Sequence, residues 1–221
     1  MRNIIGIIIA ITLTITALSP VSADAAMSSA SASDISIKGE YLIRDNDGMH
    51  SRYVVLAENT SPDDISVKAD FHALSSDGKE IKTVHDVASA VKSGQTFIIY
   101  GQYLNDAIAD AASFSYDLHV NSTSGCRYDA VSVDVSRTAN DTIAVSGTNY
   151  SKSDVIAVNV RGVFYKDGVP VAFDTVNIGD QGYVLSGGAG SVQELMQTFT
   201  DYDDYVITYF VEAKNPLPEE F

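Results

Sequence analysis

The chain alternates short hydrophobic runs with turn residues, and the clearest run covers residues 65–73. Its apolar residues are Ile65, Val67, Ala69, Phe71 and Ala73, and its polar residues are Ser66, Lys68, Asp70 and His72. Strict alternation predicts a strand with one buried face and one solvated face, which is typical of antiparallel sheets. The Asp77-Gly78 pair that follows predicts a hairpin turn.

Similar runs along the rest of the chain predict an all-β protein. In the first half, the expected strands cover residues 35–43, 53–57, 65–73, 81–84, 96–100 and 114–120. In the second half, they cover residues 131–135, 143–147, 156–165, 169–173, 183–185 and 205–211. About six short strands in each half, separated by frequent turn signals, predict an immunoglobulin-like antiparallel β-sandwich.

The turn residues of the first half recur in the second half. Asn59-Thr60-Ser61 and Asp77-Gly78 return ninety positions later as Asn149-Tyr150-Ser151 and Asp167-Gly168. A repeat of this length is a whole domain, because solenoid units span only about 20 to 50 residues. The aligned strand keeps its apolar face only if one residue is inserted after Asp154 and one is removed before Asp167. A β-bulge can absorb the insertion.

Helix signals are few. Ser191-Val192-Gln193-Glu194 fits a capping box, and Leu195, Met196 and Phe199 continue a helical spacing from Val192. The counterpart in the first half is the less apolar segment 105–112. We therefore expect two tandem immunoglobulin-like sandwiches with a short helix in at least the second.

The predicted organisation begins with a signal peptide at residues 1–25. Arg2 precedes a short uncharged apolar run with a small-residue exit, which is typical of a secretory signal rather than a membrane span. An uncleaved anchor is the alternative. The remaining predicted parts are a low-complexity leader at 26–34, a sandwich at 35–121, a linker at 122–127, a second sandwich at 128–214 and a C-terminal tail at 215–221.

The charge balance restricts the partners of the chain. Lys and Arg number 14 against 29 Asp and Glu, which gives a formal net charge of −15. Such a surface repels phosphate backbones, so nucleic-acid binding is not expected. The single cysteine, Cys126, has no internal partner for a disulfide. A spectator thiol is the favoured interpretation, and an intermolecular bridge is the alternative.

The most distinctive chemical pattern is a pair of Asp-x-His triplets, Asp70-Phe71-His72 and Asp117-Leu118-His119. Alternation directs each aspartate and histidine outward. Imidazole and carboxylate together suit zinc, and two neighbouring strands could present four ligands. The favoured interpretation is an ordinary solvated face without metal or cofactor, and Asp70, His72, Asp117 and His119 are the alternative ligand set. Asp45-Asn46-Asp47-Gly48 lacks the spacing of a calcium loop and predicts a hairpin turn.

The segment 201–205 combines acidic and aromatic residues. Tyr202, Asp203 and Tyr205 form a candidate interaction surface for a basic or sugar-bearing partner, with a solvated turn as the alternative. The chain contains no G-x-S-x-G, H-E-x-x-H or phosphate-binding glycine loop. We therefore expect no catalytic residues and no enzymatic activity.

The segment from Val163 to Gly168 resembles the FxLYD-type domains of exported bacterial proteins. These domains carry an N-x-S element, an alternating strand that ends in an aromatic pair, and an Asp-Gly hairpin. The matching residues are Asn149, Ser151, Phe164, Tyr165, Asp167 and Gly168. In the first half, Ala73-Leu74 replaces the aromatic pair. The resemblance implies a sandwich fold on envelope or secreted proteins and implies no catalytic residues.

The first functional hypothesis is an exported, non-enzymatic protein that serves as an interaction or spacer module. Its location would be the cell surface or the extracellular space, with an unknown protein or cell-surface partner and no stable membrane span after signal cleavage. The alternative is a small-ligand or metal-ion binding protein that uses the Asp/His face of the first sandwich.

Overall fold

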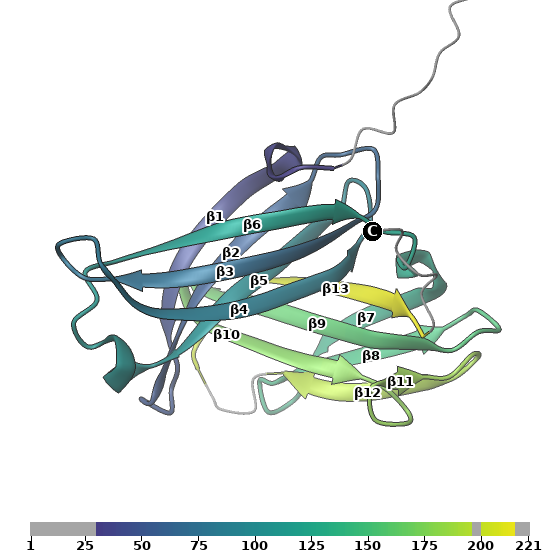
Figure 1. Cartoon of the computed structure of the whole chain (residues 1–221). Coiled ribbons are helices and arrows are strands. Elements are labelled where there is room, and N and C mark those ends of the chain that lie inside the picture. The colour runs from purple at the N-terminus through teal and green to yellow at the C-terminus, as the bar shows by residue number, and fades with distance from the viewer. Residues whose placement is uncertain (1–29, 196–199, 215–221) are drawn as a thin grey trace, which may run out of the picture.

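The computed structural model describes residues 30–195 and 200–214. The predicted signal peptide, residues 26–29 of the predicted leader and the predicted C-terminal tail lie outside these residues. In Figure 1 the purple to teal strands of the first half lie above the green to yellow strands of the second half. No helix in the described ranges is long and apolar enough to cross a membrane.

The first half forms an N-terminal sandwich of two antiparallel sheets with strand orders β1-β2-β5 and β4-β3-β6. Its strands are β1 (Ile35–Arg44), β2 (His50–Asn59), β3 (Ile65–Leu74), β4 (Glu80–Val91), β5 (Thr96–Leu104) and β6 (Ser113–Ser122). Short 3₁₀ turns, η1 (Ala32–Asp34) and η2 (Asn105–Ile108), flank this set, and η3 (Tyr128–Ala130) leads into the second half.

The second half forms a C-terminal sandwich with the same strand order. Its strands are β7 (Val131–Arg137), β8 (Ile143–Asn149), β9 (Val155–Lys166), β10 (Val169–Ile178), β11 (Val184–Leu185), β12 (Gly190–Leu195) and β13 (Asp204–Ala213). The sheets are β7-β8-β12 and β10-β9-β13, and β11 pairs with the start of β9. The predicted all-β, antiparallel sandwich fold is confirmed.

Each sandwich encloses its own hydrophobic core. In the N-terminal sandwich, Val67, Phe71 and Phe97 are fully buried, as the alternation along β3 predicts. In the C-terminal sandwich, Val158 and Phe164 occupy the corresponding interior. The polar residues that alternate with the core residues lie on the outer face of each sheet. One face of each sheet therefore packs into the core of its own sandwich.

A third apolar cluster joins the two sandwiches. Ile43, Val54, Leu56 and Ile98 project from the β1-β2-β5 sheet and pack with Val163 and Phe173 of the C-terminal sandwich. The β1-β2-β5 sheet is therefore buried on both faces. This explains why β2 and β5 contain continuous apolar runs, which are typical of sheets covered on both sides.

The repeated asparagines are buried structural residues. Asn59 is fully buried; its Nδ2 donates to the carbonyl of Asp63 at 2.8 Å, and its Oδ1 accepts from Ser61 N at 3.0 Å. Asn149 is also fully buried and makes the same contacts with Ser153 O at 2.9 Å and Ser151 N at 3.0 Å. The recurring N-x-S element thus fixes the same turn in both sandwiches.

The predicted insertion in β9 is present as a bulge. Ala157 has a positive φ of 48°, and the β9–β13 register shifts between Phe210 and Glu212 at this point. The compensating deletion lies in the following hairpin, where Lys166 pairs with Val169 across a two-residue turn. Asp167-Gly168 has φ values of 50° and 75°, as a primed hairpin turn requires.

The expected helix at Ser191 is wrong. Residues 191–195 belong to β12, which pairs with β8 from Gly190 opposite Thr148 to Leu195 opposite Ile143. Residues 196–199 lie outside the described part. The capping signal is local, whereas the ladder with β8 satisfies the backbone of the whole segment, so tertiary pairing overrides the local preference. In the first half, the segment expected to form a helical turn, 105–112, contains only the short 3₁₀ turn η2 (Asn105–Ile108).

Candidate functional site

The junction between the sandwiches contains a buried ion pair that sequence reasoning missed. Arg161 on β9 is 4% exposed, and its Nη1 and Nη2 lie 2.5 and 3.0 Å from the two carboxylate oxygens of Asp86 on β4. Nη1 also donates to the carbonyl of Ile98 at 2.8 Å. A buried guanidinium requires partners of this kind, because an unpaired charge in the interior is strongly destabilising.

Aromatic rings enclose this ion pair. The Arg161 guanidinium lies 5.0 Å from the ring centres of both Tyr100 and Phe210. Asp86 also accepts a hydrogen bond from the backbone N–H of Tyr100 at 3.0 Å. The arginine is therefore held by groups from both sandwiches. The only sequence signal was a charge within the otherwise apolar run of β9.

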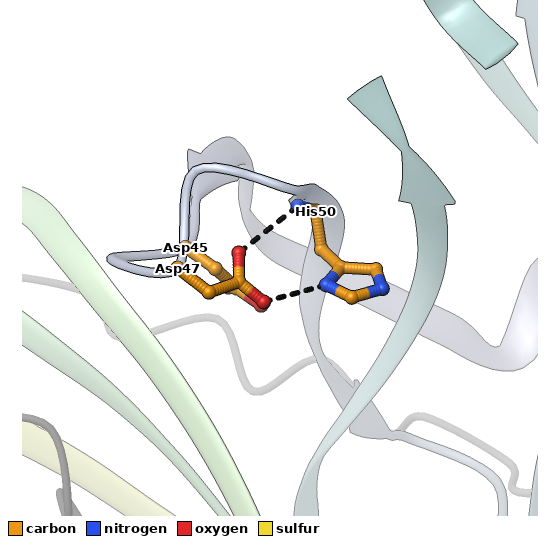
Figure 2. Close-up of side chains that lie close together, drawn as sticks. All are labelled: Asp45, Asp47 and His50. Atoms are coloured by element: carbon orange, nitrogen blue, oxygen red, sulfur yellow. Dashed lines mark hydrogen bonds and ion pairs between the residues drawn. The ribbon is translucent and has the colours of Figure 1, made fainter. Parts of the chain in front are cut away.

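A cleft of about 340 Å³ lies beside this junction, between the β1–β2 turn and β10, and Glu194 also lines it. Asp45, Asp47 and His50 each place one potential ligand atom within 4.8 Å of the others. Figure 2 shows the Asp47 carboxylate directed toward both the ring and the backbone of His50. The charges lining the cleft are mixed, because Arg52 is also present.

The contacts of this cluster are those of a hairpin turn. Asp47 Oδ2 lies 2.6 Å from His50 Nδ1, and Asp45 Oδ1 accepts from Arg52 Nη1 at 2.5 Å. The hydrogen bond from His50 lowers the pKa of Asp47, whereas burial raises the pKa of Asp45 against the opposing effect of Arg52. Asp45 N donates to His50 O at 3.0 Å, so the predicted turn is confirmed. Arg52 already neutralises Asp45 through Oδ1, which weakens the attraction of this carboxylate for a cation.

Sheet pairing brings the predicted Asp/His residues together on the outer face of β4-β3-β6. β3 and β6 are neighbours, with Asp70 directly opposite Asp117. His72 Nε2 lies 3.3 Å from Asp117 Oδ2, and His119 Nε2 lies 3.3 Å from Asp70 Oδ2. A four-ligand site requires β3 and β6 to be adjacent, and they are. The four side chains do not converge on one point in this conformation.

His85 on β4 also belongs to this face and was missed in the sequence. It lies directly opposite Asp70, with Nδ1 at 2.7 Å from Asp70 Oδ1. Hydrogen bonds from His85 and then His119 lower the pKa of the Asp70 carboxyl. Three of the four histidines in the chain thus share one face of one sheet.

The predicted aromatic surface at Tyr202, Asp203 and Tyr205 is corrected by the structure. Tyr202 is 3% exposed, packs against Phe164 at 5.2 Å between ring centres, and donates its hydroxyl to the carbonyl of Asp141. Tyr205 packs against the same core, and Asp203 is exposed. Tyr202, just before β13, is thus part of the C-terminal core and has no free ring face for a partner, and Tyr205 at the start of β13 is partly buried.

Cys126 lies in the connection between the sandwiches. It pairs with Glu212 in an isolated bridge, and its Sγ lies 3.9 Å from the carbonyl of Ala90. Burial raises the pKa of the thiol to about 11. The thiolate is the reactive form of cysteine, so a raised pKa favours the predicted spectator thiol over an intermolecular bridge.

Comparisons with known proteins give little guidance. No family model matches the chain, and no curated protein matches it. Among solved structures, a transglutaminase from red sea bream is similar with a TM-score of 0.26 and 10% sequence identity. The similarity covers 73% of this chain and 26% of the transglutaminase chain. At this level the comparison supports no functional argument.

Proposed function

We propose that this chain is an exported, non-enzymatic tandem β-sandwich protein that acts as an interaction or spacer module at the cell surface or in the extracellular space. The observation that carries the proposal is the buried junction, in which Asp86 and Arg161 pair within a shell of apolar side chains. A junction of this kind holds two sandwiches at a fixed angle, as a spacer requires.

The junction also has a second, polar part that supports a fixed arrangement. Gln95, just before β5, donates from Nε2 to the carbonyl of Tyr209 on β13, and Lys92 lies 2.6 Å from an Asp129 oxygen. Beside these contacts, Tyr128 stacks on Tyr209 within the second half, with ring centres 4.5 Å apart. Hydrogen bonds, an ion pair and apolar packing therefore act together, whereas freely moving domains are usually joined by small polar contacts.

The resemblance to FxLYD-type domains and the predicted signal peptide support the location part of the proposal. The sequence contains no G-x-S-x-G, H-E-x-x-H or phosphate-binding glycine loop, which supports the non-enzymatic part of the proposal. The large acidic excess favours a soluble exported protein.

The spacer proposal is tested by NMR relaxation of the purified chain. We expect both sandwiches to report one common rotational correlation time, because a fixed junction makes them tumble as a single body. Asp86→Ala, which removes the partner of the buried arginine, is expected to give the two sandwiches separate correlation times. Independent tumbling of the wild-type sandwiches would contradict the spacer role.

Two further measurements test the rest of the proposal. Fractionation of the producing cells is expected to place the chain outside the cytoplasm, with residues 1–25 removed. Incubation with envelope polymers and peptides is expected to give no turnover. A chain found in the cytoplasm would contradict export. More than one turnover per chain would contradict the non-enzymatic assignment.

A further inference from the structure

The Asp/His face has a local two-fold arrangement. Asp70-x-His72 on β3 and Asp117-x-His119 on β6 run antiparallel, and the two aspartates stand directly opposite each other. Each histidine therefore lies diagonally beside the aspartate of the other strand, with the same 3.3 Å separation between Nε2 and Oδ2. Like charges in directly opposed positions destabilise a sheet. A cation between the strands would relieve this repulsion.

His72 is oriented as a metal ligand would be. Its Nδ1 lies 2.8 Å from Thr83 Oγ1 and 3.0 Å from Glu80 Oε2. We assign the ring proton to Nδ1, since both partners can accept it. The unprotonated Nε2 then points toward Asp117. Metal-binding histidines usually donate their other ring N–H to such an acceptor, which fixes the tautomer and the ring orientation.

The Nε2 atom of His72 lacks a hydrogen bond. It is inaccessible to solvent and, among the described residues, has no hydrogen-bond partner. Although Asp117 Oδ2 is 3.3 Å away, the geometry is not that of a hydrogen bond. With the proton on Nδ1, two electron-pair donors face each other. An ion bound to both atoms would satisfy them together.

The separation of these two atoms fits a tetrahedral ion. Zinc binds imidazole nitrogen at about 2.0–2.1 Å and carboxylate oxygen at about 2.0–2.2 Å, which places neighbouring tetrahedral ligands about 3.4 Å apart. The observed 3.3 Å between His72 Nε2 and Asp117 Oδ2 agrees with this spacing. The backbone beneath them is rigid, because Phe71 between Asp70 and His72 is fully buried.

We propose that the outer face of β3 and β6 binds one zinc-class divalent transition-metal ion through His72 Nε2 and Asp117 Oδ2. Asp70 is the third protein ligand, and water completes the coordination. Directly opposed residues have Cβ atoms about 4.5–5.5 Å apart, so rotation of the Asp70 side chain brings its carboxylate to the ion. Imidazole among the ligands favours zinc and similar metals over calcium or magnesium.

The test is isothermal titration calorimetry of the purified, chelator-treated chain with zinc chloride near neutral pH. We expect one zinc ion per wild-type chain. His72→Gln is expected to weaken the affinity by about tenfold or more, a loss typical of damage to a metal site. The matched control is His50→Gln, which removes an imidazole on the β1–β2 turn that contacts Asp47 and none of the proposed ligands, and which is expected to leave the affinity unchanged.

Ring resonances and stability provide a second readout. Zinc is expected to shift the His72 ring signals in the NMR spectrum and to leave those of His50 in place. Zinc should also raise the urea midpoint of the wild-type chain but not that of His72→Gln, because a ligand that binds only the folded state stabilises it. Absence of binding, wild-type affinity in His72→Gln, or an equal loss in His50→Gln would overturn the proposal.

Discussion

The outer face of β4-β3-β6 and the outer face of β10-β9-β13 occupy equivalent places in the two sandwiches but have opposite environments. In the first, Asp70 is opposite His85 on one side and Asp117 on the other. In the second, Arg161 is opposite Thr175 and Thr208. The strand registers also show which other residues occupy equivalent positions in the two sandwiches. Val163 is the equivalent of His72, Phe210 of His119, Val206 of Ser115 and Phe173 of Thr83.

This comparison shows that the role of a sheet face depends on what packs against it. On the C-terminal sandwich, the equivalents of two histidines are Val163 and Phe210, which are buried against the N-terminal sandwich. On the N-terminal sandwich, no described strand of the other sandwich covers the histidines, and His85 and His119 are 70% and 59% exposed. One copy of the face stabilises the junction, and the other is free to acquire a binding role.

The junction is not repeated at the far side of the C-terminal sandwich. β8 is the equivalent of β2, and Asn149 in β8 corresponds to Asn59 in β2. In this register Ala144 and Ser146 of β8 replace the junction residues Val54 and Leu56. Two of the apolar junction residues are thus replaced by small or polar ones, whereas Val192, opposite Ser146, places an exposed apolar side chain at the position of Ile98.

The largest effect is expected from Asp86→Ala. This change leaves the Arg161 guanidinium buried without its carboxylate partner, and such a loss costs about 3–5 kcal/mol in the free energy of unfolding. Urea denaturation followed by circular dichroism measures it. Asp117→Ala on the outer face of β4-β3-β6 is the control. In the presence of chelator, it is expected to change the free energy of unfolding by less than about 0.5 kcal/mol. Equal effects would contradict the contrast between the faces.

A smaller loss is expected from Phe210→Ala. Phe210 is 5% exposed and packs into the core cluster of the N-terminal sandwich, although it belongs to β13. Truncating a fully buried phenylalanine costs about 3–5 kcal/mol, and we expect the lower end of this range because Phe210 keeps some exposure. The matched control is His119→Ala at the equivalent register position, because its side chain is 59% exposed. Thermal and urea unfolding should separate the two variants clearly, and a destabilised His119→Ala would mean that the free face also carries stability.

Much of the fold could be predicted because each sandwich repeats local patterns. The alternation along β3 predicted its buried face, and the two Asp-Gly pairs marked the hairpins after β3 and β9. The bulge in β9 followed from keeping Val158 and Val160 on the apolar face. These features depend on residues close in sequence, so the sequence alone contains the necessary information.

The junction and the full Asp/His face could not be predicted, because both depend on contacts between distant segments. The partner of Arg161 is on β4, 75 residues earlier, and nothing near either residue indicates the pairing. Likewise, β6 joins β3 across two intervening strands, so the contact of His72 with Asp117 requires the complete sheet order. The segment from Ser191 is a further case in which distant contacts decide the structure. Its local helix signal is overridden by strand pairing with β8.

The smallest effect is expected from Asp70→Asn, measured as a function of pH in the presence of chelator. Hydrogen bonds from His85 and His119 lower the pKa of Asp70 in the folded state. A lowered pKa means that the carboxylate contributes stability above its unfolded pKa of about 3.9 and loses it as pH falls through the folded pKa. The variant should therefore be slightly less stable than wild type near neutral pH, and the difference should disappear in acid. Because the side chain is partly exposed, solvent screens the contribution and keeps it small. A difference in stability that persisted in acid would show that Asp70 acts through packing rather than through its charge. The outer face of β4-β3-β6 would then contribute to stability by packing, as the equivalent face does at the junction.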